Sequence, residues 1–259
     1  MDIALSHTKK TSSNITFCVL SYSFFDMTAR CIDSILSFEK DALILLADNR
    51  SPDNTYVRLS HRYRSNKQVK IYGFEANFGV AKGRNMLGGM VETDMLVFID
   101  NDAYITSSIS NAVMDKLSQK NIGAYGVPLL LDDKLRCYNQ DVVNTSVDAI
   151  GGALFAVRTA LFKELGGFDE SYGLFGHEDI DFCLALKSQG YSIIGNAKLP
   201  FVHEDHHSSS LLPDKDILEA KTQQRLFEKW GDKQHLLEIE RQHIDYLSCV
   251  NCPEVWKRH

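Results

Sequence analysis

The N-terminal half of the chain alternates between short apolar runs and longer stretches with apolar residues at helical spacing. The apolar runs are ITFCVLSY (15–22), ALILLAD (42–48), VKIYGF (69–74) and DMLVFIDNDAYI (94–105). The first of them lacks the strict alternation of a half-exposed strand, which is typical of parallel strands buried on both faces. The segment FDMTARCIDSILSF (25–38) predicts a helix. We therefore expect a β-α-β-α order and a mixed, mostly parallel α/β sheet flanked by helices.

The second half of the chain is less regular. Residues 147–207 mix strand, helix and glycine-rich loop, and YSIIGNAKLPFV (191–202) predicts one strand with Pro200 near its end. After Pro213 the pattern is helical from about residue 214 to 247, with a break near Gly231. The prediction is one domain over residues 1–212, with residues 1–14 flexible, and a C-terminal helical extension over residues 213–259 that packs on it.

Composition and charge exclude several classes of protein. The 259 residues are 44% hydrophobic and 24% charged, which is ordinary for a globular protein, and the net charge of −6 gives no indication of nucleic-acid binding. No apolar run approaches the ~18 residues of a membrane span, and the N-terminus lacks the apolar segment of an export signal. We expect a cytoplasmic protein. We expect its C-terminal helices to pack on the domain; the alternatives are a lid, an acceptor platform, a homo-oligomer contact or a peripheral contact with a membrane.

Two local patterns suggest zinc. Cys249 and Cys252 form a single C-x-x-C pair without a second pair, which is weak support for a metal site. Residues 203–207, HEDHH, fit the expression H-E-x-x-H, in which a helix places two histidines on zinc. This segment follows a predicted strand and precedes three serines and Pro213, so we do not expect a helix there. We expect His203 to ligate a cation instead, and His206 and His207 to contact phosphate or solvent.

Polar side chains follow the predicted strands at the point where each one ends. They are Ser21 and Tyr22, Asp48 and Asn49, and the pair Asp100 and Asp102. In open α/β sheets ligands bind at this edge. Two carboxylates at such a position can coordinate a hard divalent cation, although turn residues that cap a strand would look the same in the sequence.

Six features in a fixed order resemble family 2 inverting glycosyltransferases with the GT-A fold. The resemblance covers residues 15–207, and it rests on order and spacing rather than on any single motif. The features are the strand that ends in Ser21-Tyr22, the turn ADNRSPDNT, the stretch NFGVAKGRN, the D-x-D motif DND, the block from IGGALF to GHEDIDF, and a histidine after the following strand.

The resemblance implies transfer of a sugar from a nucleoside-diphosphate sugar, with a UDP-sugar expected, to an acceptor hydroxyl. Asp102, His203 and Asp100 would hold Mn²⁺ or Mg²⁺, which neutralises the leaving diphosphate as a Lewis acid. Asp100 would reach the ribose or a metal-bound water. Asp48 would accept hydrogen bonds from the nucleobase, and the planar fork of Arg84 suits phosphate. The full set of expected donor-binding residues is Ser21, Tyr22, Asp48, Asn77, Arg84, Asp100 and Asn101.

An inverting transfer also needs a general base that takes the proton of the acceptor hydroxyl. By resemblance Asp179 is this base, and Glu178 orients the acceptor or its loop. The alternative is that both acids, like Asp181, only favour the start of a helix through its macrodipole. Gly151 and Gly152 would let the backbone approach the acceptor or the donor sugar closely.

The chain departs from the family pattern at two positions. Arg50 stands where the turn often carries glycine, and Ala185 stands where the helix often carries arginine. These departures leave open the donor sugar and the acceptor, whether a glycan, a lipid-linked saccharide, a protein or a modified nucleic acid. A non-catalytic nucleotide-sugar-binding protein is one alternative. A nucleotidyltransferase is another, but it would need a glycine-rich phosphate loop near the first strand, and SYSFFDMTAR (21–30) is not one.

Overall fold

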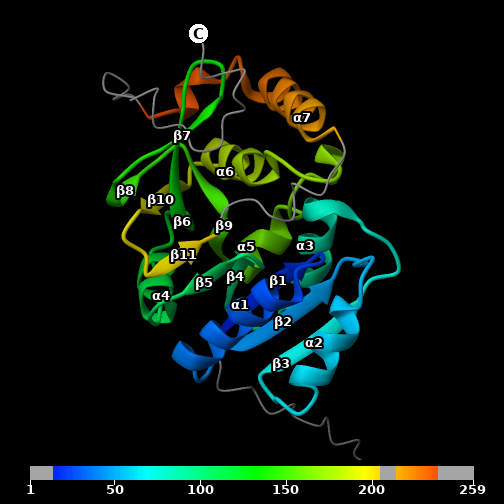
Figure 1. Cartoon of the computed structure of the whole chain (residues 1–259). Coiled ribbons are helices and arrows are strands. Elements are labelled where there is room, and N and C mark those ends of the chain that lie inside the picture. The colour runs from blue at the N-terminus through cyan, green and yellow to red at the C-terminus, as the bar shows by residue number, and fades with distance from the viewer. Residues whose placement is uncertain (1–13, 205–213, 239–259) are drawn as a thin grey trace, which may run out of the picture.

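A nine-stranded mixed sheet forms the centre of the computed structural model, which describes residues 14–204 and 214–238 (Figure 1). The strand order is β3-β2-β1-β4-β9-β6-β10-β8, and β7 pairs with β6. The strands are β1 (Ile15–Ser21), β2 (Leu43–Asp48), β3 (Val69–Gly73), β4 (Met95–Asp100), β6 (Ile122–Leu131), β7 (Cys137–Asn139), β8 (Val143–Ser146), β9 (Ala149–Arg158) and β10 (Ser192–Asn196).

Strand direction confirms the predicted fold class. β1, β2, β3, β4, β6 and β10 run one way, whereas β7, β8 and β9 run the other way. The register places Ser21 beside Asp48, and Leu20 beside Asp100. The carboxyl ends of β1, β2 and β4 therefore meet at one edge of the sheet, as the strand-end residues predicted.

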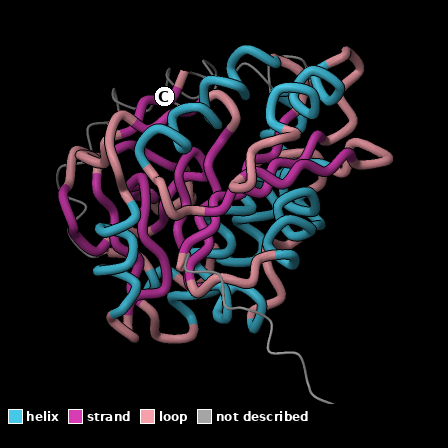
Figure 2. The backbone as a smooth tube through the Cα atoms, turned by 90° about the horizontal axis from the view of Figure 1, so that it is seen from below, coloured by secondary structure: helices cyan, strands magenta, loops and turns pink. Residues whose placement is uncertain are grey.

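Helices cover both faces of the sheet, because alternate strand residues point to opposite sides (Figures 1 and 2). One apolar core joins the sheet to the helices α1 (Phe25–Phe38), α2 (Thr55–Tyr63) and α4 (Ser110–Ser118). The other core joins it to α3 (Gly79–Met90), α5 (Thr159–Glu164), α6 (Glu178–Ser188) and α7 (Lys215–Trp230). Short 3₁₀ turns lie at Glu170–Tyr172 and Gln234–Leu236. No helix in the described part of the chain combines the length and apolarity needed to span a membrane.

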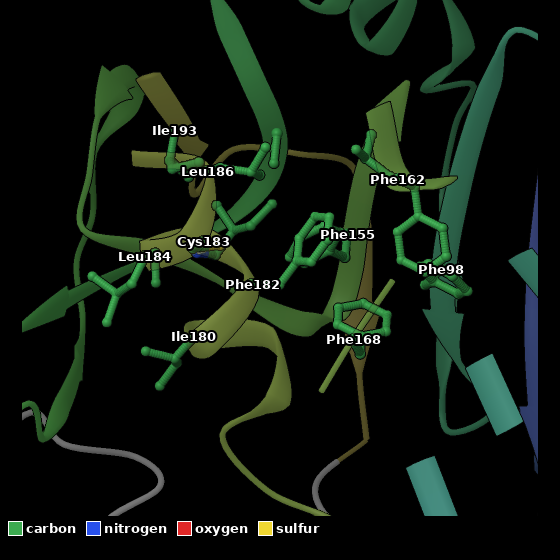
Figure 3. Close-up of a cluster of buried hydrophobic side chains, with 14 of the residues drawn as sticks. Phe98, Phe155, Phe162, Phe168, Ile180, Phe182, Cys183, Leu184, Leu186 and Ile193 are labelled. Carbon is green, nitrogen blue, oxygen red and sulfur yellow. Dashed lines mark hydrogen bonds between the residues drawn. The ribbon is translucent and has the colours of Figure 1, made fainter. Parts of the chain in front are cut away.

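A cluster of five phenylalanines lies between the sheet and α6 (Figure 3). Ring centroids of neighbouring members are 5.3–5.9 Å apart, in tilted or edge-to-face arrangements. The cluster consists of Phe98, Phe155, Phe162, Phe168 and Phe182. Because Phe182 is on α6 and Phe98 is on β4, this packing fixes the first turn of α6 relative to the end of β4.

Two segments that were each predicted as one strand are two strands. Residues 94–105 divide at the turn Asn101-Asp102 into β4 and β5 (Ala103–Ile105), and residues 191–203 divide into β10 and β11 (Phe201–His203). The second division has a local cause, since Asn196 Oδ1 accepts a hydrogen bond from the Lys198 amide and Pro200 lacks an N–H. β5 and β11 pair with each other in a separate two-stranded sheet.

α7 is the described part of the expected helical extension, and it ends at Trp230, beside the predicted break at Gly231. It is joined to α6 through Asp181, which accepts hydrogen bonds from Tyr172 Oη, Lys229 Nζ and Trp230 Nε1. Asp181 is thus a buried anchor as well as a first-turn acid. The predictions for residues 1–13, His206, His207, Cys249 and Cys252 lie outside the described residues.

Candidate active site

A cleft of about 600 Å³ opens at the carboxyl ends of β1 and β4. This volume lies within the range of small-molecule sites. Eleven of the residues that line it were expected at the site from the sequence, and they are Tyr22, Asn77, Arg84, Asp100, Asn101, Asp102, Gly151, Gly152, Glu178, Asp179 and His203.

Asp100, Asp102 and His203 form a group whose ligand atoms all lie within 4.8 Å of one another. His203 Nε2 is 3.2 Å from Asp102 Oδ1 and 3.9 Å from Asp100 Oδ2. The small β5–β11 sheet brings them together, because His203 pairs with Ala103 and the Glu204 amide donates to the Asp102 carbonyl at 2.8 Å. The histidine expected to share a cation with Asp102 is therefore at the right place, on a strand and not on a zinc-protease helix.

The donor set fits a divalent cation. Burial raises the pKa of Asp100, and the neighbouring charge of Asp102 raises it further although Arg84 opposes both effects. A cation among these carboxylates would relieve that repulsion. The side chains of Asp100 and His203 are 36% and 23% exposed, so they remain open to the cleft. Two carboxylates and one imidazole are ligands that suit Mn²⁺ or Mg²⁺, and this group contains no thiolate of the kind that favours zinc.

Arg84 connects the metal side of the cleft to its other side. This guanidinium is 4% exposed, and its Nη2 donates to Asp100 Oδ1 at 2.5 Å and to the Gly152 carbonyl at 3.0 Å. Its Nη1 lies 3.5 Å from Glu178 Oε1. A planar fork can hold three groups in fixed relative positions in a way that a lysine cannot.

Asp179 lies at the start of α6 and is held by backbone amides. Its Oδ2 accepts from the Gly152 amide at 2.6 Å, and its Oδ1 accepts from the Ile180 amide at 2.8 Å. A β-carbon at Gly152 would lie 2.6 Å from Arg84 Nη1 and 3.3 Å from Asp179 Oδ2. Gly152 therefore allows the close approach of Arg84 and Asp179, whereas its expected approach to a bound sugar remains a prediction.

Glu178 is buried beside Asp179, and the Gly176 amide donates to its Oε2 at 3.0 Å. Burial raises the pKa of Glu178 from 4.5 to about 7, the charge of Asp179 adds to this rise, and Arg84 opposes it. Glu178 faces Arg84 and the loop before α6, which agrees with a role in positioning that loop.

Two of the expected donor-binding residues do not line the cleft. Ser21 is fully buried and its Oγ lies 3.0 Å from Thr28 Oγ1. Both oxygens of Asp48 accept from Ser51, from its hydroxyl at 2.5 Å and from its amide at 2.9 Å. Contact of either residue with a nucleobase therefore remains a prediction. Asn101 does line the cleft, while its Nδ2 donates to Thr28 Oγ1.

Asn49 lines the cleft, and although the sequence marked it as a polar residue at a strand end, it was not assigned a role in donor binding. It is 3% exposed; its Nδ2 donates to Asn77 Oδ1 at 2.9 Å, and its Oδ1 accepts from the Phe78 amide at 3.0 Å. The available signal was its position directly after β2. The next residue, Arg50, has a φ of 65°, a conformation that glycine adopts without strain, which accounts for the glycine expected at this turn.

His177 was not expected to line the cleft, and the C-terminal helices were expected to pack on the domain, with a lid or an acceptor platform only as an alternative. His177 Nδ1 lies 2.9 Å from Thr222 Oγ1 of α7, and burial lowers the pKa of this histidine. Lys215, Asp216 and Glu219 of α7 line the cleft as well. Their sequence resembles an ordinary solvated helix, so only the tertiary contacts reveal their position.

Comparison with known proteins agrees with this geometry. Residues 16–135 match the model of the family described as glycosyl transferase family 2. No curated protein sequence matches the chain.

Three solved structures share the fold at low sequence identity. GalNAc-T7 with UDP, GalNAc and Mn²⁺ is 15% identical (TM-score 0.71), and the match covers 86% of this chain but 50% of GalNAc-T7. The mannosyltransferase PcManGT from Pyrobaculum calidifontis, in complex with GDP-Man and Mn²⁺, is 16% identical (TM-score 0.67), with 86% and 68% coverage. TarS 1–349 from S. aureus with UDP-GlcNAc is 17% identical (TM-score 0.61), with 91% and 70% coverage. The chain thus spans about half the length of the first of these proteins.

Proposed function

With a glycosyl transferase family 2 domain over residues 16–135 as the premise, we propose that this protein moves a sugar from a nucleoside-diphosphate sugar to an acceptor hydroxyl. We expect the donor to be a UDP-sugar, the cation to be Mn²⁺ or Mg²⁺, and the anomeric configuration to invert. The three similar structures carry UDP, GDP-Man with Mn²⁺, or UDP-GlcNAc, which supports a nucleotide-sugar donor.

One observation carries the proposal. The cation-ligand group and the Asp179 carboxylate line the same cleft, and a continuous set of contacts connects them. Arg84 binds Asp100 and the Gly152 carbonyl, and the Gly152 amide binds Asp179. A cation at one side of the cleft can stabilise the leaving diphosphate. A carboxylate held at the other side can accept a proton from the acceptor hydroxyl.

The roles of the residues follow from their positions. Asp100, Asp102 and His203 would hold the cation, which supplies positive charge to the leaving diphosphate. Arg84 keeps Asp100 in place and adds positive charge near the diphosphate. Asp179 would accept the proton of the acceptor hydroxyl as that oxygen attacks the anomeric carbon.

Inversion follows from the arrangement of these groups in the proposal. A base on the side of the sugar opposite the leaving diphosphate favours a single in-line displacement without a covalent intermediate. Because two backbone amides hold Asp179, its carboxylate has little freedom to turn toward the anomeric carbon as a nucleophile. Glu178 would set the position of this loop through Gly176 and Arg84.

A donor screen tests the proposal. The full chain is incubated with Mn²⁺ and a panel of UDP- and GDP-sugars, and release of the nucleoside diphosphate is measured. At least one donor should turn over, and Asp179→Asn should slow the turnover by about 10²- to 10⁴-fold, the usual contribution of a general base. Asp115→Asn, on the exposed face of α4, is the matched control. Binding of a donor without any turnover would instead identify a non-catalytic nucleotide-sugar-binding protein.

A further inference from the structure

Part of the cleft lining is apolar; we call this part the apolar wall, and we call the region that it shares with the start of α7 the second arm of the cleft. Leu129 of β6, Cys137 of β7 and Ile180 of α6 form this wall, and Val127 lies beside them. A diphosphate bound at the cation group would lie at the other side of Gly152, beside Asp100. In the proposed transfer the donor diphosphate does not occupy this arm, so the arm is available to the acceptor.

α7 borders this arm, and it is attached to the rest of the protein on two sides. Gln223 Nε2 donates to the carbonyls of Lys134 and Leu135 at 3.1 and 3.2 Å, which binds α7 to the β6–β7 hairpin. Thr222 Oγ1 lies 2.9 Å from His177 Nδ1, which binds α7 to the loop that carries Asp179. The first two turns of α7 therefore have a fixed position over the arm.

The residues of α7 that face the rest of the protein change from charged to apolar along the helix. Leu226 and Trp230 are buried in the core, whereas Glu219, about two turns before Leu226 on the same stripe, lines the cleft together with Asp216. Burial raises the pKa of Cys137, and the charges of Asp179 and Glu219 add to this rise, which agrees with a position of the Glu219 carboxylate near the apolar wall. A helix that needed only to pack would carry an apolar residue at this position.

The charges around the arm restrict what can bind there. Asp179, Asp216 and Glu219 contribute three carboxylates, and Lys215 contributes one ammonium group. Like charges placed against each other are strongly unfavourable, so a phosphorylated acceptor would be repelled. Carboxylates accept hydrogen bonds from hydroxyl groups, and the apolar wall suits the C–H face of a sugar ring.

We propose that this arm is an acceptor subsite for an uncharged saccharide, with Glu219 of α7 binding its hydroxyl groups and Leu129 and Cys137 packing against its ring. The inference rests on the proposed transferase function and adds the class of acceptor. Glu219 is a specificity-determining residue, and Asp179 takes the proton of the hydroxyl that reacts.

Binding of small glycosides to the full chain tests the subsite independently of turnover. Saturation-transfer NMR is recorded with UDP and Mg²⁺ for neutral methyl glycosides of glucose, mannose and N-acetylglucosamine, and for glucose 6-phosphate and glycerol phosphate. At least one neutral glycoside should bind and the two phosphates should not. Glu219→Gln should weaken that binding about tenfold. Glu228→Gln, on the exposed face of the same helix, should leave it unchanged.

A charge reversal and a kinetic comparison complete the test. Glu219→Lys should admit the phosphorylated compounds, and in the donor assay Glu219→Gln should raise the acceptor KM more than the donor KM. Binding of the phosphates to the unaltered chain, absence of binding by every neutral glycoside, or equal binding by Glu219→Gln would overturn the subsite. Glycoside binding without release of nucleoside diphosphate from any donor would support the subsite and reject the transferase function.

Discussion

Arg84 and Asp100 form an ion pair at the floor of the cleft, with 2.5 Å between Nη2 and Oδ1. The same guanidinium faces the buried Glu178 and the Gly152 carbonyl, so one cation balances charges from β4 and α6. The two halves of the site therefore depend on Arg84 for their relative position.

Arg84→Ala should lower the free energy of unfolding by about 3 kcal/mol, because it removes the counter-charge of Asp100, the cation near Glu178 and the donor to the Gly152 carbonyl. Arg62→Ala, which breaks the exposed ion pair with Asp33, should cost less than about 1 kcal/mol. Urea unfolding of both variants measures the difference. Equal losses would mean that the Arg84 ion pairs contribute no more than a surface pair.

Glu178 should make stability depend on pH. Its pKa rises from 4.5 to about 7 on folding, so the folded state favours the protonated form. This contribution is complete below pH 4.5 and is lost as the pH rises through 7, which amounts to on the order of 2 to 3 kcal/mol. Glu178→Gln should therefore flatten the decrease in Tm between pH 5 and pH 8. Parallel Tm profiles for the two proteins would contradict this assignment.

Neighbouring glycines offer a matched pair of substitutions. Gly152→Ala places a methyl group 2.6 Å from Arg84 Nη1 and 3.3 Å from Asp179 Oδ2, and should reduce kcat by at least about 100-fold because both groups must shift. Gly151→Ala would meet only Leu129, at 3.7 Å, and should lose less than about tenfold. Steady-state rates of nucleoside diphosphate release measure both, and similar losses would show that the close approach at Gly152 is not needed.

The positions of the candidate cation ligands were predictable from the sequence because parallel strands end at one edge. A buried apolar run that ends in Asp100-Asn101-Asp102 has to present its carboxylates there, and β11 returns His203 to the same edge through its pairing with β5. The split of residues 94–105 into two strands was not predicted, since the turn at Asn101 depends on its contact with Thr28.

The acceptor side was less predictable for a physical reason. Glu219 and His177 reach the cleft only because α7 contacts the β6–β7 hairpin and the loop before α6. These segments are far apart in the sequence. The spacing of Glu219 is equally typical of a solvated helix face. For Asp48 the sequence suggested more than the structure contains: this residue was expected to bind a nucleobase, but both of its carboxylate oxygens accept hydrogen bonds from Ser51 in the same turn.

His203 should contribute directly to cation affinity. His203→Asn removes the imidazole that lies 3.2 Å from Asp102 and should weaken Mn²⁺ binding by at least about tenfold, measured by electron paramagnetic resonance of free Mn²⁺. His61→Asn, at an exposed position on α2, is the control. Unchanged Mn²⁺ affinity in His203→Asn would remove this residue from the ligand set.

The dependence of nucleotide-sugar turnover on the cation tests the central claim most directly. Release of nucleoside diphosphate from the preferred donor is measured with Mn²⁺, after chelation, and for Asp102→Ala at saturating Mn²⁺. Turnover should require the cation and fall by at least about 100-fold in Asp102→Ala, because the leaving diphosphate loses its counter-charge. The same rate with and without Mn²⁺, together with full activity of Asp102→Ala, would contradict the account.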